Sequence, residues 1–178
     1  MALIKTNARS ATALDATILT GTVPSGSYTS GKVLQVIRAS TTTTTSTSST
    51  SMVDITNLTV NITPSATSSK IYVIMNVNGI ASSASALSGV SLRIYRASDV
   101  SGEAINIGFG TTDALNDSAT LTALESPSST SELTYKGQCK NREANAVSVN
   151  NSSDTSSITV MEIAAWLIMI NFTKHYLF

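Results

Sequence analysis

The sequence predicts an all-β protein, a sandwich or a barrel. Short segments in which apolar and polar residues alternate recur along the chain, and this is the pattern of strands with one buried face. Polar segments rich in Ser, Thr, Asn and Gly separate them, and no long segment has a helical period. The chain has 178 residues, of which 42% are hydrophobic, so it is long enough for one core. We expect one main domain at 32–165, an extended arm at 1–31 and an apolar extension at 166–178.

The expected central strand is 70–78, which follows a polar turn at 64–69. Successive side chains of a strand point to opposite faces. One face carries Ile71, Val73, Met75 and Val77, and the other carries Tyr72, Ile74, Asn76 and Asn78. We therefore expect a strand that begins in the core and ends at a wet rim, where Gly79 lets the chain turn.

Further strands are expected wherever the two-residue period returns. They are 33–37, 58–62, 90–95, 105–109, 132–136, 147–150 and 158–164. The Thr and Ser run at 40–51 fits either an exposed hairpin edge or a surface loop, and we favour the hairpin. Segment 111–120 reads as a polar loop. Arg93 and Tyr95 are expected on the side of their strand that faces away from the core.

The arm at 1–31 carries apolar residues that it cannot bury by itself, namely Leu14, Ile18, Leu19 and Val23. Leu14, Ile18 and Leu19 have helical spacing for barely one turn before Gly and Pro residues break the pattern. We expect the arm to dock on a neighbouring subunit or on another protein. The alternative is an ordinary frayed terminus.

The charge pattern excludes one class of partner. Eleven basic residues balance eleven acidic ones, charged residues make up 12% of the chain, and Lys and Arg form no cluster that would neutralise phosphates. We expect no nucleic-acid partner. The single Cys139 cannot form an intrachain disulfide, and residues 1–10 lack the pattern of a secretory signal. These features indicate synthesis and folding in a reducing cytoplasm, and Cys139 reads as an ordinary strand-end residue.

The sequence offers little catalytic chemistry. The single His175 lies near the end of the chain, where a surface or contact role is expected. Zinc-ligand spacing, a phosphate-binding loop and a calcium-loop pattern are all missing from the sequence. The pairs Asp99 with Glu103 and Asp113 with Asp117 could serve glycoside hydrolysis or bind calcium, but they read as turn residues. We expect no enzyme, and no catalytic, cofactor or metal site.

Several motifs, taken in their order along the chain, resemble a family of virion proteins from tailed bacteriophages, a family of capsid decoration proteins, head fibres and tail-fibre tips. The motifs are Gly31-Lys32-Val33-Leu34-Gln35-Val36, a Thr-rich segment, Ile62-Thr63-Pro64-Ser65, Ser68-Ser69-Lys70-Ile71, residues 88–93, and Ile158-Thr159-Val160-Met161-Glu162-Ile163-Ala164-Ala165. The most specific are the Ile-Thr-Pro-Ser turn and the Met-Glu-Ile strand. Leu14-Asp15-Ala16-Thr17 also resembles the N-terminal attachment pieces of such proteins.

The resemblance implies a jelly-roll-like β-sandwich that forms a homotrimer, with the N-terminal arm fixing it to the major capsid protein or another virion protein. It places the protein on the virion surface, after synthesis in the cytoplasm of the host bacterium. Because the arm is short and no long shaft precedes the domain, we favour a capsid decoration (cement) protein or a head fibre. Unpaired strand edges would be protected by neighbouring subunits.

Two alternatives stay open. A tail-fibre or receptor-binding tip would contact host surface glycans through Tyr28, Arg93, Tyr95 and the Thr-rich strip 41–45. A soluble carbohydrate-binding module would need a platform of exposed rings, and the chain has only one Trp, five Tyr and three Phe.

The extension at 166–178 departs from the family pattern, since related chains tend to stop near the Glu-Ile-Ala-Ala segment. Its uninterrupted apolar part, 163–170, is far shorter than the ~20 residues that a bilayer-spanning helix needs. We therefore expect no membrane anchor. An apolar extension of this kind should be buried, either as an added strand or in a subunit contact.

Overall fold

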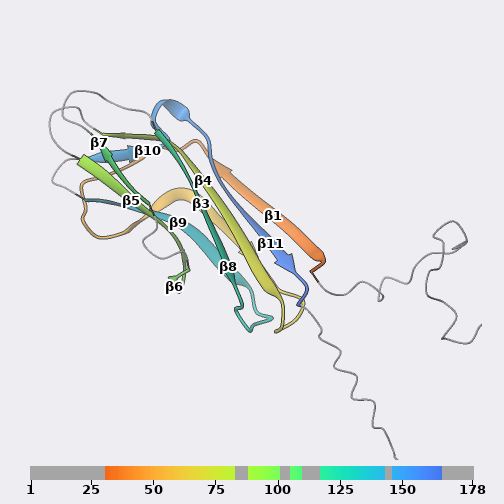
Figure 1. The fold of residues 1–178 in the computed structure, drawn as a ribbon. Helices are drawn as coiled ribbons and strands as arrows, with labels where there is room; N and C mark the ends of the chain where they lie inside the picture. The colour runs from red at the N-terminus through yellow and green to blue at the C-terminus, as the bar shows by residue number, and fades with distance from the viewer. Residues whose placement is uncertain (1–30, 83–87, 101–104, 110–116, 143–145, 166–178) are drawn as a thin grey trace, which may run out of the picture.

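The computed structural model describes residues 31–82, 88–100, 105–109, 117–142 and 146–165 (Figure 1). These residues confirm the all-β prediction, because they form antiparallel strands and contain no α-helix. The strands are β1 (Val33–Thr41), β2 (Thr45–Thr47), β3 (Val53–Ile62), β4 (Lys70–Ser82), β5 (Ser88–Arg96), β6 (Ser98–Asp99), β7 (Ile105–Phe109), β8 (Asp117–Glu125), β9 (Leu133–Asn141), β10 (Val147–Val149) and β11 (Ser156–Ile163). A 3-10 turn, η3 (Asn151–Ser153), precedes β11.

The strands form two sheets with a β-sandwich-like arrangement. The first sheet has the order β1-β11-β4, with β8 on the other side of β4, and the short β10 and β2 extend it at the far end of β4. The second sheet has the order β3-β9-β5, with β6 and β7 also pairing with β5. In Figure 1 the long strands of the first sheet run together from the upper end of the molecule to the end where the described chain enters and leaves.

The space between the two sheets holds one hydrophobic core. It is built from the inward-facing residues of strands in both sheets, including Leu58, Val60 and Ile62 of β3 and Val90, Leu92 and Ile94 of β5. The predicted alternation in the central strand is confirmed, because Ile71, Val73, Met75 and Val77 of β4 are all fully buried. Burying one such side chain stabilises the fold by about 1.5 to 3 kcal/mol. The residues that alternate with them, including Tyr72 and Ile74, are half-buried.

The turn predicted at Gly79 is wrong. Strand β4 continues to Ser82, and its pairing with β8 shifts register between Val77 and Ile80. Gly79 has a φ of +60°, which other residues rarely adopt, and a Cβ at this position would lie 2.6 Å from the backbone nitrogen of Asn151. The glycine therefore makes an irregularity within the strand and lets η3 approach the backbone.

The polar loop predicted at 111–120 is also wrong in its last part, because strand β8 begins at Asp117. This strand has a two-residue period, with Leu121 and Ala123 buried and Thr120 and Thr122 exposed. Its inward-facing residues are mostly small, so the apolar signal in the sequence is weak. Pairing with the central strand β4 determines its structure.

The Thr-rich run 40–51 is only partly a surface element. Thr41 and Thr45 are buried, and β2 pairs with β10. The Thr45 hydroxyl accepts a hydrogen bond of 2.8 Å from the backbone nitrogen of Thr56, which ties the run to β3. The predicted exposed strip therefore has a Thr side chain buried at each end, and a wholly exposed hairpin is excluded.

Candidate interaction surfaces

The outer face of the first sheet carries a row of apolar side chains that have little cover. Cross-strand register places Val36 of β1 opposite Met161 of β11, Met161 opposite Tyr72 of β4, and Tyr72 opposite Leu124 of β8. Residues directly opposite each other in a sheet share a face, and the strand neighbours of these four point to the core. Val36 is 55% exposed and Leu124 is 57% exposed, while the two central residues are half-buried. We call these four residues the apolar outer row.

The apolar outer row is unusual because exposed large apolar residues in a row, rather than scattered singly, indicate a contact site. Val33 and Leu34, near the start of β1, add to the exposed apolar surface at 46% and 42%. The sequence suggested a compact apolar strand at 33–37, and the strand exists, but it lies at the edge of the sheet. Its apolar residues therefore serve the surface more than the core.

The described chain enters and leaves the sandwich at the end where this row lies. The backbone nitrogen of Gly31 donates a hydrogen bond of 3.1 Å to the carbonyl of Ala164, and the nitrogen of Ala164 donates one of 2.9 Å to the carbonyl of Lys32. In Figure 1 the start of β1 and the end of β11 lie side by side at this end. Whatever precedes Gly31 and follows Ala165 is therefore connected to the margin of the apolar outer row.

A buried carboxylate ties the same end together from the inside. Glu162 of β11 is only 1% exposed, and its Oε1 accepts hydrogen bonds from the Ser65 nitrogen at 2.7 Å, the Ser65 hydroxyl at 2.6 Å and the Ser69 hydroxyl at 2.6 Å. The Gln35 side-chain amide donates to Oε2 at 2.7 Å and to the Thr63 carbonyl at 2.8 Å. Burial by itself raises the pKa of Glu162, but the hydrogen bonds from Ser65 and its neighbours outweigh it and lower the pKa.

This cluster explains what the motifs of the sequence do. The Ile-Thr-Pro-Ser turn supplies Ser65, the Met-Glu-Ile strand supplies Glu162, and the segment that begins at Gly31 supplies Gln35. Three motifs that are far apart in the sequence meet at one carboxylate. Their role in this chain is structural, since they hold β1, β11 and the turn 63–69 in place.

The outer face of the second sheet is polar, and a chain of hydrogen bonds covers it. The guanidinium Nε of Arg93 donates to Gln138 at 2.7 Å, the Gln138 amide donates to Asp54 at 2.6 Å, and the Lys136 ammonium donates to the other Asp54 oxygen at 2.7 Å. The Arg93 guanidinium lies 4.9 Å from the centre of the Tyr95 ring. Partial burial raises the pKa of Asp54, but the hydrogen bonds from Gln138 and Lys136 outweigh it and lower the pKa. We call these five residues the polar outer strip.

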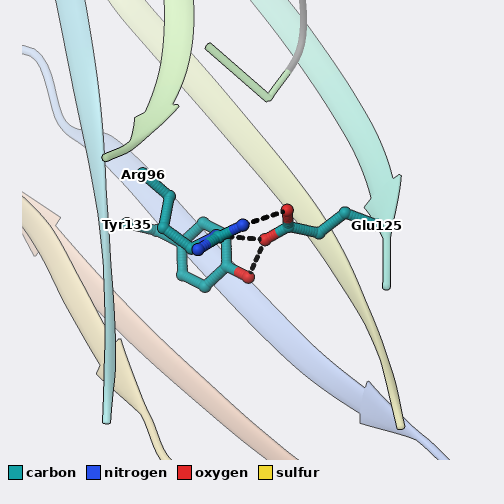
Figure 2. A network of polar contacts seen from close by, with 3 residues as sticks. All are labelled: Arg96, Glu125 and Tyr135. Atoms are coloured by element: carbon teal, nitrogen blue, oxygen red, sulfur yellow. Dashed lines mark hydrogen bonds and ion pairs between the residues drawn. The ribbon is translucent and has the colours of Figure 1, made fainter. Parts of the chain in front are cut away.

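The two sheets are joined at one end by the polar network shown in Figure 2. The guanidinium of Arg96 on β5 donates hydrogen bonds of 2.7 and 2.9 Å to the carboxylate of Glu125 on β8, and the hydroxyl of Tyr135 on β9 donates to the same carboxylate. Burial and the negative charge of Glu125 raise the pKa of Tyr135, and the hydrogen bond to Glu125 raises the pKa of Arg96. The tyrosine therefore stays neutral and the arginine stays charged, and the network links β5, β8 and β9 as a structural clamp between the sheets.

The other end of the sandwich has an open depression of about 440 Å³. Its lining includes Asn78, Gly79, Asp117 and Asp154. Among the described residues, no group of three His, Cys, Asp or Glu side chains is arranged to hold a metal ion. Asp117, predicted to pair with Asp113, accepts a hydrogen bond from the backbone nitrogen of Ser118 at 2.7 Å, and Asp113 lies outside the described residues.

The remaining predicted residues fall into three groups. Arg93 and Tyr95 lie together on the polar outer strip, half-buried, on the side of β5 that faces away from the core, as predicted. Cys139 is buried within β9, and burial raises the pKa of its thiol to about 12, so it is an unreactive core residue. The last group lies outside the described residues. It consists of Tyr28, His175 and the arm residues Leu14, Ile18, Leu19 and Val23.

No protein-family model matches the chain, and no curated protein sequence matches it either. The resemblance to phage virion proteins therefore stays a prediction from the motifs. In the part of the chain that the structure describes, no helix has the length and hydropathy needed to cross a bilayer.

Proposed function

We propose that the chain is a non-enzymatic structural protein of a bacteriophage particle, a trimeric capsid decoration (cement) or head-fibre protein anchored by its N-terminal arm. The observation that carries this proposal is that the chain enters and leaves the sandwich at one end, beside the apolar outer row. An arm attached at that point would hold the apolar surface close to the particle or to a neighbouring subunit. The polar outer strip on the other sheet would face solvent.

The order of the strands supports a jelly-roll-like fold. When the three short strands β2, β6 and β10 are set aside, the remaining strands can be numbered in chain order. The first sheet then has the order 1-8-3-6 and the second sheet the order 2-7-4-5. This order is the one expected for two interleaved Greek keys in a jelly roll, a fold found in viral capsid proteins and lectins. Fold alone does not assign function, so the attachment surface carries the argument.

Binding to the particle tests this proposal. The full chain is mixed with purified empty capsids and sedimented, and the same is done with the arm variant I18D/L19D and with a control in which polar arm residues change, S25D/S27D. We expect the parent and the control to sediment with capsids and the arm variant to stay in solution, because an aspartate would be unfavourable in an apolar contact. Equal binding by all three proteins, or by none, would contradict attachment through the arm.

A specific observation also favours a second candidate, a tail-fibre or receptor-binding tip that contacts host surface glycans. The Tyr95 ring, with Arg93 beside it, lies on an outer face rich in hydrogen-bonding groups. However, Arg93 lies over this ring, and the other tyrosines with described side chains are on the opposite sheet (Tyr72) or in the core (Tyr135), so these rings form no shared platform. Binding to a glycan array that Y95A abolishes and Y72A preserves would support this candidate over capsid attachment.

A further inference from the structure

The apolar outer row is an exposed apolar surface that the fold of the sandwich does not explain. It crosses four adjacent strands, and because neighbouring strands lie about 4.8 Å apart, it is roughly 14 Å wide. Its two end residues, Val36 and Leu124, are more than half exposed. The core between the sheets is complete without them, so folding of the sandwich does not explain why they are apolar.

An apolar part of the chain follows Ala165 directly in the sequence. Residues 166–170 read Trp-Leu-Ile-Met-Ile. The chain reaches this point from β11, which carries Met161 of the row, and the backbone pairing of Ala164 with Lys32 holds the exit at the margin of the row. An extended five-residue segment is about 17 Å long, so its length matches the width of the row. We call residues 166–170 the apolar segment.

The sequence indicates which copy of the row the apolar segment reaches. Strand β11 leads away from the row, so the chain would have to reverse direction soon after Ala165 to cover its own Met161. Tight reversals use Gly, Pro, Asn, Asp or Ser, and none of these occurs from Ile163 to Ile170. A second copy of the protein can offer its row to the apolar segment without any reversal.

We propose that the apolar outer row of one copy is the docking site for the apolar segment of a second copy. If each copy donates its segment to the next, the contact is head-to-tail, and a threefold rotation between copies would close it into the trimeric ring of the proposed function. The inference rests on the assembly part of that proposed function and not on attachment to a particle. Failure of capsid binding therefore leaves it untouched.

The chain contains its own reporter, because Trp166 is the only tryptophan. Its fluorescence emission shifts to shorter wavelength when the ring leaves water. We would record the emission maximum and the mass in solution for the full chain over a dilution series. The row variant V36K/L124K and the control T59K, an exposed change on β3 in the other sheet, are measured in the same way.

We expect the parent and T59K to emit at short wavelength when concentrated and at longer wavelength on dilution, over the same range in which their mass falls to that of a monomer. The row variant should emit at long wavelength and stay monomeric throughout. A monomer with short-wavelength emission at every concentration would overturn the inference, because the segment would then cover its own chain or another surface. Long-wavelength emission from a concentrated parent would overturn it as well.

A mixing experiment separates docking between copies from docking within one chain. The segment variant W166S/I168S lacks tryptophan but keeps the row, whereas the row variant keeps Trp166 but lacks the row. Neither should associate alone. When they are mixed, we expect the emission of Trp166 to move to shorter wavelength and a complex of one copy of each to form. If mixing leaves both the emission and the masses unchanged, the inference is wrong.

Discussion

The outer faces of the two sheets are built from the same strand alternation and yet are opposites. On the first sheet, the row from Val36 to Leu124 is apolar and uncovered. On the second sheet, the strip from Arg93 to Asp54 is polar, and its side chains hydrogen-bond to one another. Both faces lie on the same core, so packing of the core does not decide which arrangement a face has.

The two outer faces differ in whether they are stable in contact with water. The polar outer strip satisfies its own hydrogen-bonding groups and can face water as it stands. The apolar outer row gains free energy only when another surface covers it. We infer that the first sheet faces a partner and the second faces solvent. Substitutions that separate stability from assembly test this comparison.

The largest expected effect tests what holds the apolar face in shape. The change E162A removes the acceptor of four hydrogen bonds, and of their donors the Gln35 amide keeps its bond to the Thr63 carbonyl. We expect the free energy of unfolding to fall by about 3 kcal/mol, because hydrogen bonds to a charged group are among the stronger ones. Urea unfolding followed by circular dichroism measures this loss. The control E132A, at an exposed glutamate, should be nearly neutral, and an equal loss in both would contradict the role of Glu162.

The next effect tests whether the two sheets act as one unit. The change E125A removes the acceptor shared by Arg96 and the Tyr135 hydroxyl (Figure 2). The expected loss of unfolding free energy is about 2 kcal/mol, since a buried hydroxyl is left without its partner. The same unfolding experiment measures this loss. If E125A loses less unfolding free energy than the control E132A, the network of Arg96, Glu125 and Tyr135 does not join the sheets.

Acid should weaken the protein through the same carboxylate. The pKa of Glu162 is lower in the folded state than its ordinary value of 4.5, so its contribution is fully present above that value and is lost as the pH falls through the folded pKa. Asp54, whose pKa is also lowered, adds to this loss. We expect the free energy of unfolding to decline on acidification, and to decline less steeply in E162Q than in the parent. Parallel curves for the two proteins would argue against the assignment to Glu162.

The smallest expected effect on stability separates the two outer faces most clearly. Because Leu124 is largely exposed, L124S should change the free energy of unfolding by less than about 0.5 kcal/mol. It should weaken self-association about tenfold or more, since the partner would lose a buried leucine contact. The comparison substitution D54N, on the polar outer strip, should leave self-association unchanged. Sedimentation equilibrium measures both, and an equal effect of the two changes would remove the distinction between the faces.

Much of the fold could be predicted from the sequence, because a strand with one buried face has alternating apolar and polar residues. The period-two pattern located β4, β5 and β11, and it put Arg93 and Tyr95 on the side that faces away from the core. It missed β8, because the inward-facing Ala119 and Ala123 are too small to stand out. It also misjudged Gly79, since a glycine that ends a strand and a glycine that bends one look alike in sequence.

The candidate surfaces were harder to predict for a physical reason. Local alternation shows that Val36 and Leu124 are apolar, but only cross-strand register shows that they share one row with Met161 and Tyr72. In the same way, the motifs around Ser65 and Glu162 could be recognised as segments, and their hydrogen bonds could not.

The sequence by itself determined the all-β class, the core-facing side of strands such as β4 and β5, and the polar or apolar character of each segment, because these depend on neighbours along the chain. The tertiary structure decided which strands are adjacent, where the chain enters and leaves, and which outer face was left uncovered. These properties depend on pairings between residues far apart in the sequence. Short strands of similar composition can be paired in many orders, and only packing around a common core selects one.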